Sequence, residues 1–156
     1  MRLGSDLQQR PDGVRHEGAD QAWVTEDLPH ATDAGTRSRH LLRAALGDDG
    51  LGLHPALVAD VVIVAGELVL NAVDHGAAGP VGTIRLAWRR TTTHVEVSVL
   101  DSGSGPSFIG DQTGVHDDEA PRGRGLLMVD AICDAWRVER DPITESTLVT
   151  ASLPLR

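Results

Sequence analysis

The sequence predicts one α+β domain in which helices cover one face of a mixed or antiparallel sheet. Apolar residues recur at helical spacing in three segments and alternate with polar residues in several others, which are the patterns of buried helices and half-buried strands. In chain order the predicted elements are helix, helix, hairpin, long loop, helix and hairpin. Helices grouped with hairpins in this way indicate an α+β sandwich.

The first part of the chain predicts a tail and an edge strand. Residues 1–20 combine charged residues and glycines with almost nothing apolar, and we expect a flexible tail there. Residues 21–156 are expected to form the folded domain, because their number suits one compact core. Residues 21–28 have the composition of a short edge strand, which Pro29 ends.

Two helices follow, and both carry end signals. Thr32 or Asp33 can cap the first helix, whose apolar residues recur at helical spacing until Gly47. Pro55 stands where prolines occur in the first turn of a helix, and the apolar stripe after it continues to Gly76. This second segment is the strongest helix signal in the sequence.

The remaining chain changes period more than once. Alternation at residues 84–88 and 95–99 predicts the two strands of a hairpin. The stretch from Asp101 to Arg124 holds five glycines and two prolines, and a loop of about twenty residues is typical of an active-site lid. A helix is expected directly after Gly125, and it is followed by strands at residues 136–139 and 148–153.

Composition excludes some classes of partner. The chain has 14 Lys and Arg against 23 Asp and Glu, a net charge of -9, so its field repels nucleic-acid phosphates and anionic membranes. No segment approaches the roughly 18 apolar residues of a membrane helix, and the start lacks a signal-peptide pattern. The single cysteine, Cys133, lies in an apolar context that suits a buried thiol. We therefore expect a cytoplasmic protein that binds neither nucleic acid nor membranes.

Polar residues on the second helix form the first candidate site. Glu67 and Asn71 are four residues apart and project from one face, which Asp74 or His75 continues a turn later. A carboxylate can act as a general base, and an amide oxygen is a ligand that suits Mg²⁺. Taken alone, such a stripe is more often a solvated helix face.

The second candidate motif ends a strand. Asp101 closes a strongly alternating segment, and Gly103 and Gly105 follow it. The carboxylate can accept a hydrogen bond from an exocyclic amine, while the glycines permit a tight turn and close backbone approach. In isolation, aspartate and glycine after a strand are usually only a turn.

The third candidate motif opens the last helix. Gly123 and Gly125 flank Arg124, and Arg122 precedes them. The free N–H groups at the start of a helix can bind phosphate, and both arginines add positive charge. A loop end with two solvated arginines explains the same residues equally well.

In this order and spacing, the motifs resemble the nucleotide-binding boxes of the GHKL (Bergerat-fold) superfamily of ATPases and kinases. The anti-sigma-factor serine/threonine kinase branch is the most similar, and the resemblance covers residues 28–155 through residues 67–72, 101–105, 123–126 and 146–149. It implies a histidine-kinase-like ATP-binding domain, a Bergerat sandwich whose mixed sheet is covered on one face by about three helices.

The resemblance also implies roles for the first two motifs. Glu67 would be the catalytic base or the carboxylate that orients water, and Asn71 would be the Mg²⁺ ligand. Asp101 would accept a hydrogen bond from the adenine amino group. Gly103 and Gly105 would shape the adenine pocket.

The remaining roles implied by the resemblance concern the phosphates and the last hairpin. Gly123 and Gly125 would let the lid and helix start wrap the phosphates, and Arg124 or Arg122 would meet a terminal phosphate. Thr147 would contact adenine. The chemistry would be phosphoryl transfer, which depends on positioning and charge neutralisation.

Two residues depart from the pattern of the resembled family. Asp74 stands where many relatives carry a basic residue that can reach the phosphates, so it adds negative charge beside ATP. The last motif reads Glu145-Ser146-Thr147, without the glycine that relatives often place just before the threonine.

The leading hypothesis is an ATP-dependent serine/threonine kinase that phosphorylates a small antagonist protein and regulates a sigma factor. Relatives are often dimers, so a homodimer is a further expectation. The alternative is an ATP-binding regulator that sequesters its partner without phosphoryl transfer. A histidine-kinase catalytic fragment is a third hypothesis, but no upstream helical hairpin with a phosphoacceptor histidine fits in the first fifty residues.

Overall fold

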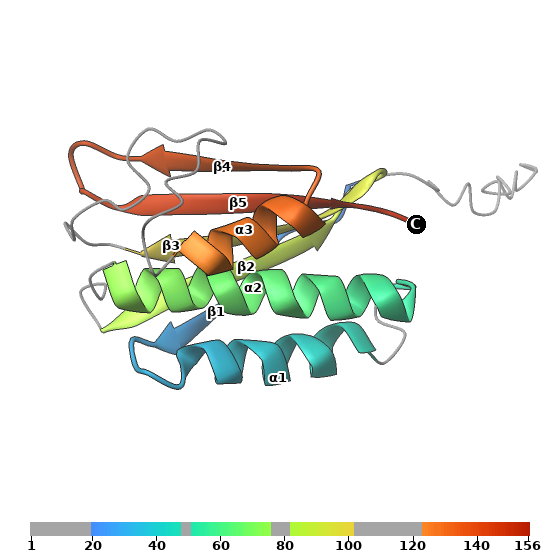
Figure 1. Cartoon of the computed structure of the whole chain (residues 1–156), viewed down its shortest axis with the longest axis horizontal. Coiled ribbons are helices and arrows are strands. Elements are labelled where there is room, and N and C mark those ends of the chain that lie inside the picture. Colours follow the sequence, from blue (N-terminus) through green and yellow to red (C-terminus); the bar gives the residue numbers. More distant parts are fainter. Residues whose placement is uncertain (1–19, 48–50, 76–81, 102–122) are drawn as a thin grey trace, which may run out of the picture.

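The computed structural model describes residues 20–47, 51–75, 82–101 and 123–156. Within these residues, five strands form one sheet in the order β1-β2-β3-β5-β4, and three helices lie on one of its faces (Figure 1). The elements are β1 Val24–Pro29, α1 Ala34–Gly47, α2 Pro55–His75, β2 Thr83–Arg90, β3 His94–Asp101, α3 Gly123–Ile132, β4 Ala135–Arg140 and β5 Thr147–Pro154. The predicted α+β class, with helices on one face, is confirmed. The predicted tail lies outside the described residues except for its last residue, Asp20.

All four strand pairings in the described residues are antiparallel, so the sheet is not mixed. The reason lies in the connection from β3 through α3 to β4. These two strands run in the same direction, but β5 lies between them and pairs antiparallel with both. The connection through α3 therefore joins two parallel strands that do not pair with each other.

The starts of α1 and α2 agree with the sequence signals. Asp33 precedes α1, and its carbonyl oxygen accepts a hydrogen bond from the Arg37 N–H at 2.9 Å, as expected of an N-cap residue. Pro55 is the first residue of α2, as predicted. His54 caps this helix, because its Nδ1 accepts a hydrogen bond from the Ala56 N–H at 3.1 Å. The sequence did not reveal this histidine cap.

The core lies between the sheet and α2. On the side of the sheet that faces the helices, apolar side chains of β2, β3 and β5 stand next to one another across the strands. Each such row of neighbours is buried against the helices. Burial of one such side chain contributes about 1.5–3 kcal/mol to folding. Two neighbouring rows are Trp88, Val97 and Ala151, and Leu86, Val99 and Val149.

The helices α1 and α2 approach each other closely at two glycines. A Cβ atom on Gly35 would lie 2.8 Å from the Cγ atom of Leu70, and one on Gly66 would lie 2.5 Å from the Nε atom of Arg39. Each pair of positions is four residues apart along its helix, so the two contacts fall one turn apart on the same interface. Side chains at either glycine would force the helices or their neighbours to shift.

The apolar length of α2 corrects one expectation from the sequence. From Pro55 to Asp74 this helix is long and apolar enough to cross a membrane by length and composition alone, whereas no segment was expected to approach that limit. Half of its apolar window is buried inside the domain. The core helix of a globular domain meets the same criterion, because it must be apolar on most sides.

Cys133 follows α3 and packs against the edge of the core. Burial raises the pKa of its thiol to about 12, and the nearby carboxylates of Asp60, Asp130 and Asp134 act in the same direction. The thiol therefore stays protonated at neutral pH. This agrees with the structural role predicted for it.

Candidate functional site

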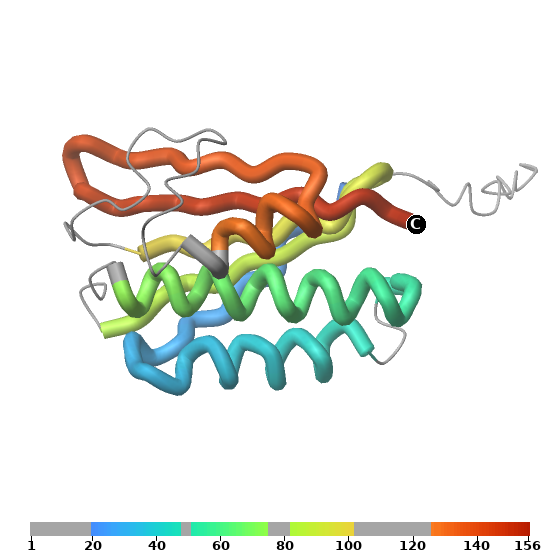
Figure 2. The backbone as a smooth tube through the Cα atoms, in the orientation of Figure 1, coloured from blue at the N-terminus to red at the C-terminus, as the bar shows by residue number. Residues whose placement is uncertain are grey.

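The predicted site residues that the structure describes lie toward one end of the sheet, which we call the site end. It is the end at which β3 finishes with Asp101 and β5 begins with Thr147. The helix α2 finishes there too, since the chain continues from it to the start of β2, which pairs with the end of β3. The helix α3 begins there, because it finishes beside the start of β4 at the opposite end (Figure 2).

Asp101 and Thr147, the two predicted adenine contacts, are direct partners across β3 and β5. Asp101 follows Val97 and Val99 at every second position of β3, so its side chain lies on the face of the sheet that the helices cover. It is 8% exposed. A carboxylate in such a place is a strong hydrogen-bond acceptor, because little water competes for it. The sequence placed these residues 46 positions apart, and the sheet register brings them together.

Glu67 and Asn71 stand one turn apart in the second half of α2, as their spacing predicts. The Glu67 side chain is 23% exposed, and its Oε1 atom lies 3.6 Å from the Nη2 atom of Arg39. The Nδ2 atom of Asn71 is buried and has no hydrogen-bond partner among the residues that the structure describes. A buried amide without a partner costs about 1–3 kcal/mol, which favours a ligand at this position.

The buried atom of the Asn71 amide is its nitrogen, a donor that does not bind a cation. The amide would hold a hard cation only after rotation that brings its oxygen to this position. In the described ranges, no group of three or more His, Cys, Asp or Glu could hold a metal ion. An ion here would take few protein ligands, as Mg²⁺ does when phosphates and waters complete its shell.

His30 is a second polar residue of this end, and it belongs to none of the sequence motifs. It follows β1, and its backbone N–H donates to the carbonyl oxygen of Gly82, which precedes β2, at 2.9 Å. Its Nε2 atom is buried without a hydrogen-bond partner among the described residues. No sequence signal indicates this burial, since a histidine after Pro29 is typical of an ordinary turn.

The third motif lies in the first turn of α3. This helix begins at Gly123, three residues before the expected start, so Gly123, Arg124 and Gly125 are its first three residues. Their backbone N–H groups have no carbonyl partner within the helix and carry its positive dipole end. Gly103, Gly105, Arg122 and most of the predicted lid lie outside the described residues.

The two departures from the expected pattern are visible in the described residues. Asp74 is exposed and lies one residue before the end of α2, at the site end. Glu145 has a φ angle of 56°, in the left-handed region where glycine is favoured, and it lies in the turn between β4 and β5. This positive φ angle lies one residue before Ser146, the position at which relatives often carry the glycine.

A search of known families finds one whose description is "Histidine kinase-like ATPase domain", and its model matches residues 28–152. The chain belongs to this family. The GHKL resemblance predicted from the motifs is thereby confirmed. A search of curated proteins finds no match.

A solved structure shares the fold of this histidine kinase-like ATPase domain. It is the crystal structure of the RsbU and RsbW domains of Rv1364c from Mycobacterium tuberculosis, with a TM-score of 0.59 and 24% sequence identity. The match covers 87% of this chain and 34% of that chain, so this chain spans about a third of the length of the protein it resembles.

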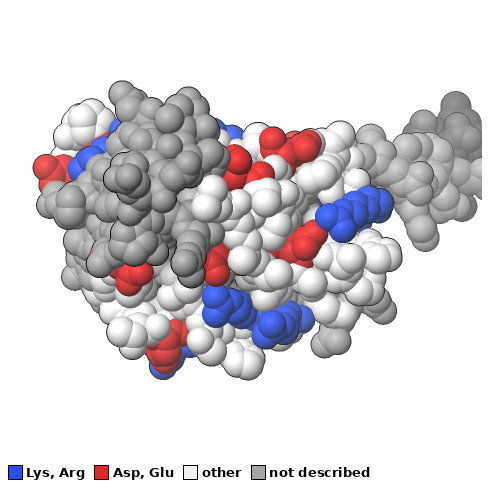
Figure 3. All heavy atoms as spheres, in the orientation of Figure 1, with Lys and Arg blue, Asp and Glu red and all other residues white. Residues whose placement is uncertain are grey.

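Charges on the helix-bearing face of the ATPase domain are mixed. Acidic and basic side chains are interspersed there, and basic side chains gather over α1 (Figure 3). Mixed charge on this face and the net charge of -9 both disfavour a nucleic-acid surface.

Proposed function

We propose that this chain is an ATP-dependent serine/threonine kinase that phosphorylates a small antagonist protein and so regulates a sigma factor. The observation that carries the proposal is the buried Asp101 beside Thr147, at the same end of the domain as Glu67, Asn71 and the start of α3. Membership of the histidine kinase-like ATPase family supports the ATP site. A cytoplasmic location belongs to the same proposal.

In this proposal Asp101 accepts a hydrogen bond from the amino group of adenine, and Thr147 makes a second contact with the base. The backbone N–H groups at the start of α3 bind the phosphates, with Arg124 or Arg122 as the cationic partner and Gly103 and Gly105 shaping the pocket. Asn71 would hold Mg²⁺, which supplies charge neutralisation at the phosphates when it is bound.

Glu67 is the general base of the transfer step. The hydroxyl oxygen of the acceptor serine or threonine forms a bond to the γ-phosphorus, while the bond from that phosphorus to the β–γ bridging oxygen breaks. The hydroxyl proton passes to the Glu67 carboxylate, and ADP carries away the bridging oxygen. Half-burial of Glu67 at the side of α2 leaves its carboxylate within reach of an incoming side chain.

The first test is a calorimetric titration of the chain with Mg²⁺-ATP. Asp101→Asn should weaken binding by about 10- to 100-fold, because an amide donor would then face the donor of adenine. Asp27→Asn is the matched control, since Asp27 lies in the edge strand β1, is exposed and pairs with Arg85. Equal affinity of the Asp101 variant and the unchanged chain would refute the adenine assignment.

The alternative is an ATP-binding regulator that sequesters its partner without phosphoryl transfer. The exposed Asp74 favours it, because its charge opposes phosphates at the site. Glu67→Gln distinguishes the two proposals when release of inorganic phosphate from Mg²⁺-ATP, with water in place of the acceptor hydroxyl, is followed at high protein concentration. Loss of release with unchanged ATP affinity supports the enzyme, whereas release that continues unchanged in the Glu67→Gln variant refutes Glu67 as the base and favours the alternative.

A further inference from the structure

The side chain of Arg39 connects α1 to the proposed catalytic base. Its guanidinium lies across α2 at Gly66, and its Nη2 atom comes within 3.6 Å of the Oε1 atom of Glu67. The arginine and glutamate side chains are 30% and 23% exposed, so water screens the pair only partly. Neither the sequence motifs nor the family match assigns a role to this arginine.

Gly66 makes the contact possible. A Cβ atom at this position would lie 2.5 Å from Nε and 3.0 Å from Cζ of Arg39, in the space that the guanidinium now fills. Glycine within a helix costs about 1 kcal/mol relative to alanine. This glycine lies in α2 at the point of contact with Arg39, and Glu67 is the next residue.

The Arg39 guanidinium attracts the Glu67 carboxylate without forming a hydrogen bond to it. A separation of 3.6 Å is longer than a hydrogen bond, so the oxygen lone pairs of Glu67 are not occupied by an Arg39 N–H group. The planar guanidinium keeps its charge at all relevant pH values. It therefore holds one side of the carboxylate while leaving lone pairs for an incoming hydroxyl group.

We infer that Arg39 is a positioning residue for Glu67, an inference that rests on the proposed kinase function. Arg39 acts through Glu67 and touches neither nucleotide nor acceptor in this role. It limits the rotamers of the glutamate side chain, so the base meets the acceptor hydroxyl in one orientation. A misplaced base lowers the rate of the transfer step and leaves nucleotide binding unchanged.

The test compares four variants of the whole chain: Arg39→Met, Arg39→Lys, Glu67→Gln and the double variant Arg39→Met/Glu67→Gln. The readouts are release of inorganic phosphate from saturating Mg²⁺-ATP and the Kd for Mg²⁺-ATP by calorimetry. Arg39→Met should slow release about 5- to 20-fold at an unchanged Kd, and Arg39→Lys should restore about half of the rate. The double variant should be no slower than Glu67→Gln alone.

Arg43→Met is the matched control, since Arg43 lies one turn further along α1, is exposed, and makes no ion pair among the described residues. Thermal unfolding of every variant checks that the fold is kept. If Arg39→Met does not fold, Gly66→Ala replaces it, because the added methyl group displaces the guanidinium and favours the helix.

The outcomes separate this inference from the proposed function. Normal release by the Arg39→Met variant, or an equal further loss when the change is added to Glu67→Gln, would overturn the positioning role alone. Normal release by Glu67→Gln would instead overturn the catalytic role of Glu67. No release from the unchanged chain would overturn the role of Glu67 as a base toward water, and the inference with it, whereas the kinase proposal itself is tested by the ATP affinity of Asp101→Asn.

Discussion

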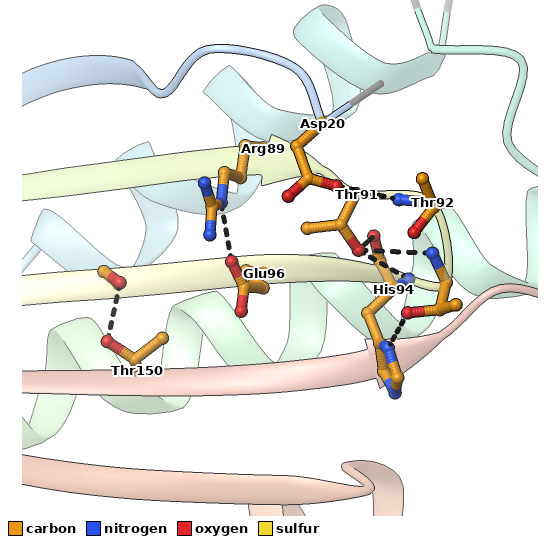
Figure 4. A network of polar contacts seen from close by, with 9 residues as sticks. Asp20, Arg89, Thr91, Thr92, His94, Glu96 and Thr150 are labelled. Carbon is orange, nitrogen blue, oxygen red and sulfur yellow. Dashed lines mark hydrogen bonds and ion pairs between the residues drawn. The ribbon is translucent and has the colours of Figure 1, made fainter. Parts of the chain in front are cut away.

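The two ends of the sheet differ in how their polar side chains are paired. At the end opposite the site, which we call the hairpin end, the turn between β2 and β3 carries a dense network (Figure 4). The Thr91 hydroxyl oxygen accepts a hydrogen bond from the His94 N–H at 2.9 Å, and the His94 ring lies 2.7 Å from the Thr93 hydroxyl and 3.1 Å from Asp134. At the site end, Asn71 and His30 have buried nitrogen atoms without partners among the described residues.

This difference separates residues that stabilise the fold from residues that are available to a ligand. A satisfied polar network contributes about 0.5–1.5 kcal/mol for each hydrogen bond, whereas a buried group without a partner costs about 1–3 kcal/mol. The cost at the site end can be offset when a ligand supplies the missing partner. Substitutions at the two ends should therefore act on different measurements.

The largest effect is expected at Asn71. Asn71→Ala should weaken Mg²⁺-ATP binding by about 10- to 100-fold, because a ligand loses its partner, while the free energy of unfolding without nucleotide changes by less than about 0.5 kcal/mol. Urea unfolding with and without Mg²⁺-ATP measures both quantities, since a bound ligand raises the free energy of unfolding with the logarithm of its concentration relative to Kd. A variant that loses stability and keeps its affinity for Mg²⁺-ATP would show that Asn71 stabilises the fold, as the residues of the hairpin end do, and does not bind the ligand.

His94 provides the opposite case. His94→Ala removes the ring contacts with Thr93 and Asp134 and should lower the free energy of unfolding by about 1 kcal/mol, with an unchanged Kd for Mg²⁺-ATP. His94→Gln is the control, because its amide can remake one of the two contacts. Weaker ATP binding by the alanine variant would show that the two ends are coupled and would break the comparison.

Local sequence signals predicted most of the fold. Each of these signals depends on residues that are close together in the sequence, and the structure agrees with them. They are Pro55, the apolar stripe of α2 and the alternation in β2 and β3. The insertion of β5 between β3 and β4 was not predicted, because strand order depends on contacts between distant segments. The cap by His54 was missed because histidine is not a usual N-cap residue.

The candidate site was predictable where motifs carry it. Asp101 and Thr147 were named from separate motifs, and the structure makes them neighbours. Arg39 was missed because its partner lies on another helix, although Gly66 in the middle of a strong helix was a usable signal of close approach. His30 became visible only through the burial of its ring nitrogen.

The turn between β4 and β5 adds a second kind of cost to the site end. Glu145 adopts a φ angle of 56° immediately before Ser146 and Thr147, and a side chain in this left-handed region costs about 1–2 kcal/mol. The turn itself is held by Asp141, whose carboxylate accepts hydrogen bonds from the backbone N–H groups of Ile143 and Thr144. These bonds hold the pKa of Asp141 below its usual range.

The smallest effect is therefore expected from Glu145→Gly. Relief of the strained backbone is partly cancelled by the greater freedom of glycine in the unfolded chain, so the free energy of unfolding should rise by about 0.5 kcal/mol. Ile143→Gly is the control, since Ile143 is 90% exposed and is not among the positive-φ residues of the described chain. It should lower stability by about 0.5–1 kcal/mol. Both are measured by urea unfolding at pH 7, where Asp141 is ionised and the turn is intact. Loss of stability in the Glu145 variant would mean that this turn carries no strain, and the site end would then differ from the hairpin end in its unpaired polar groups alone.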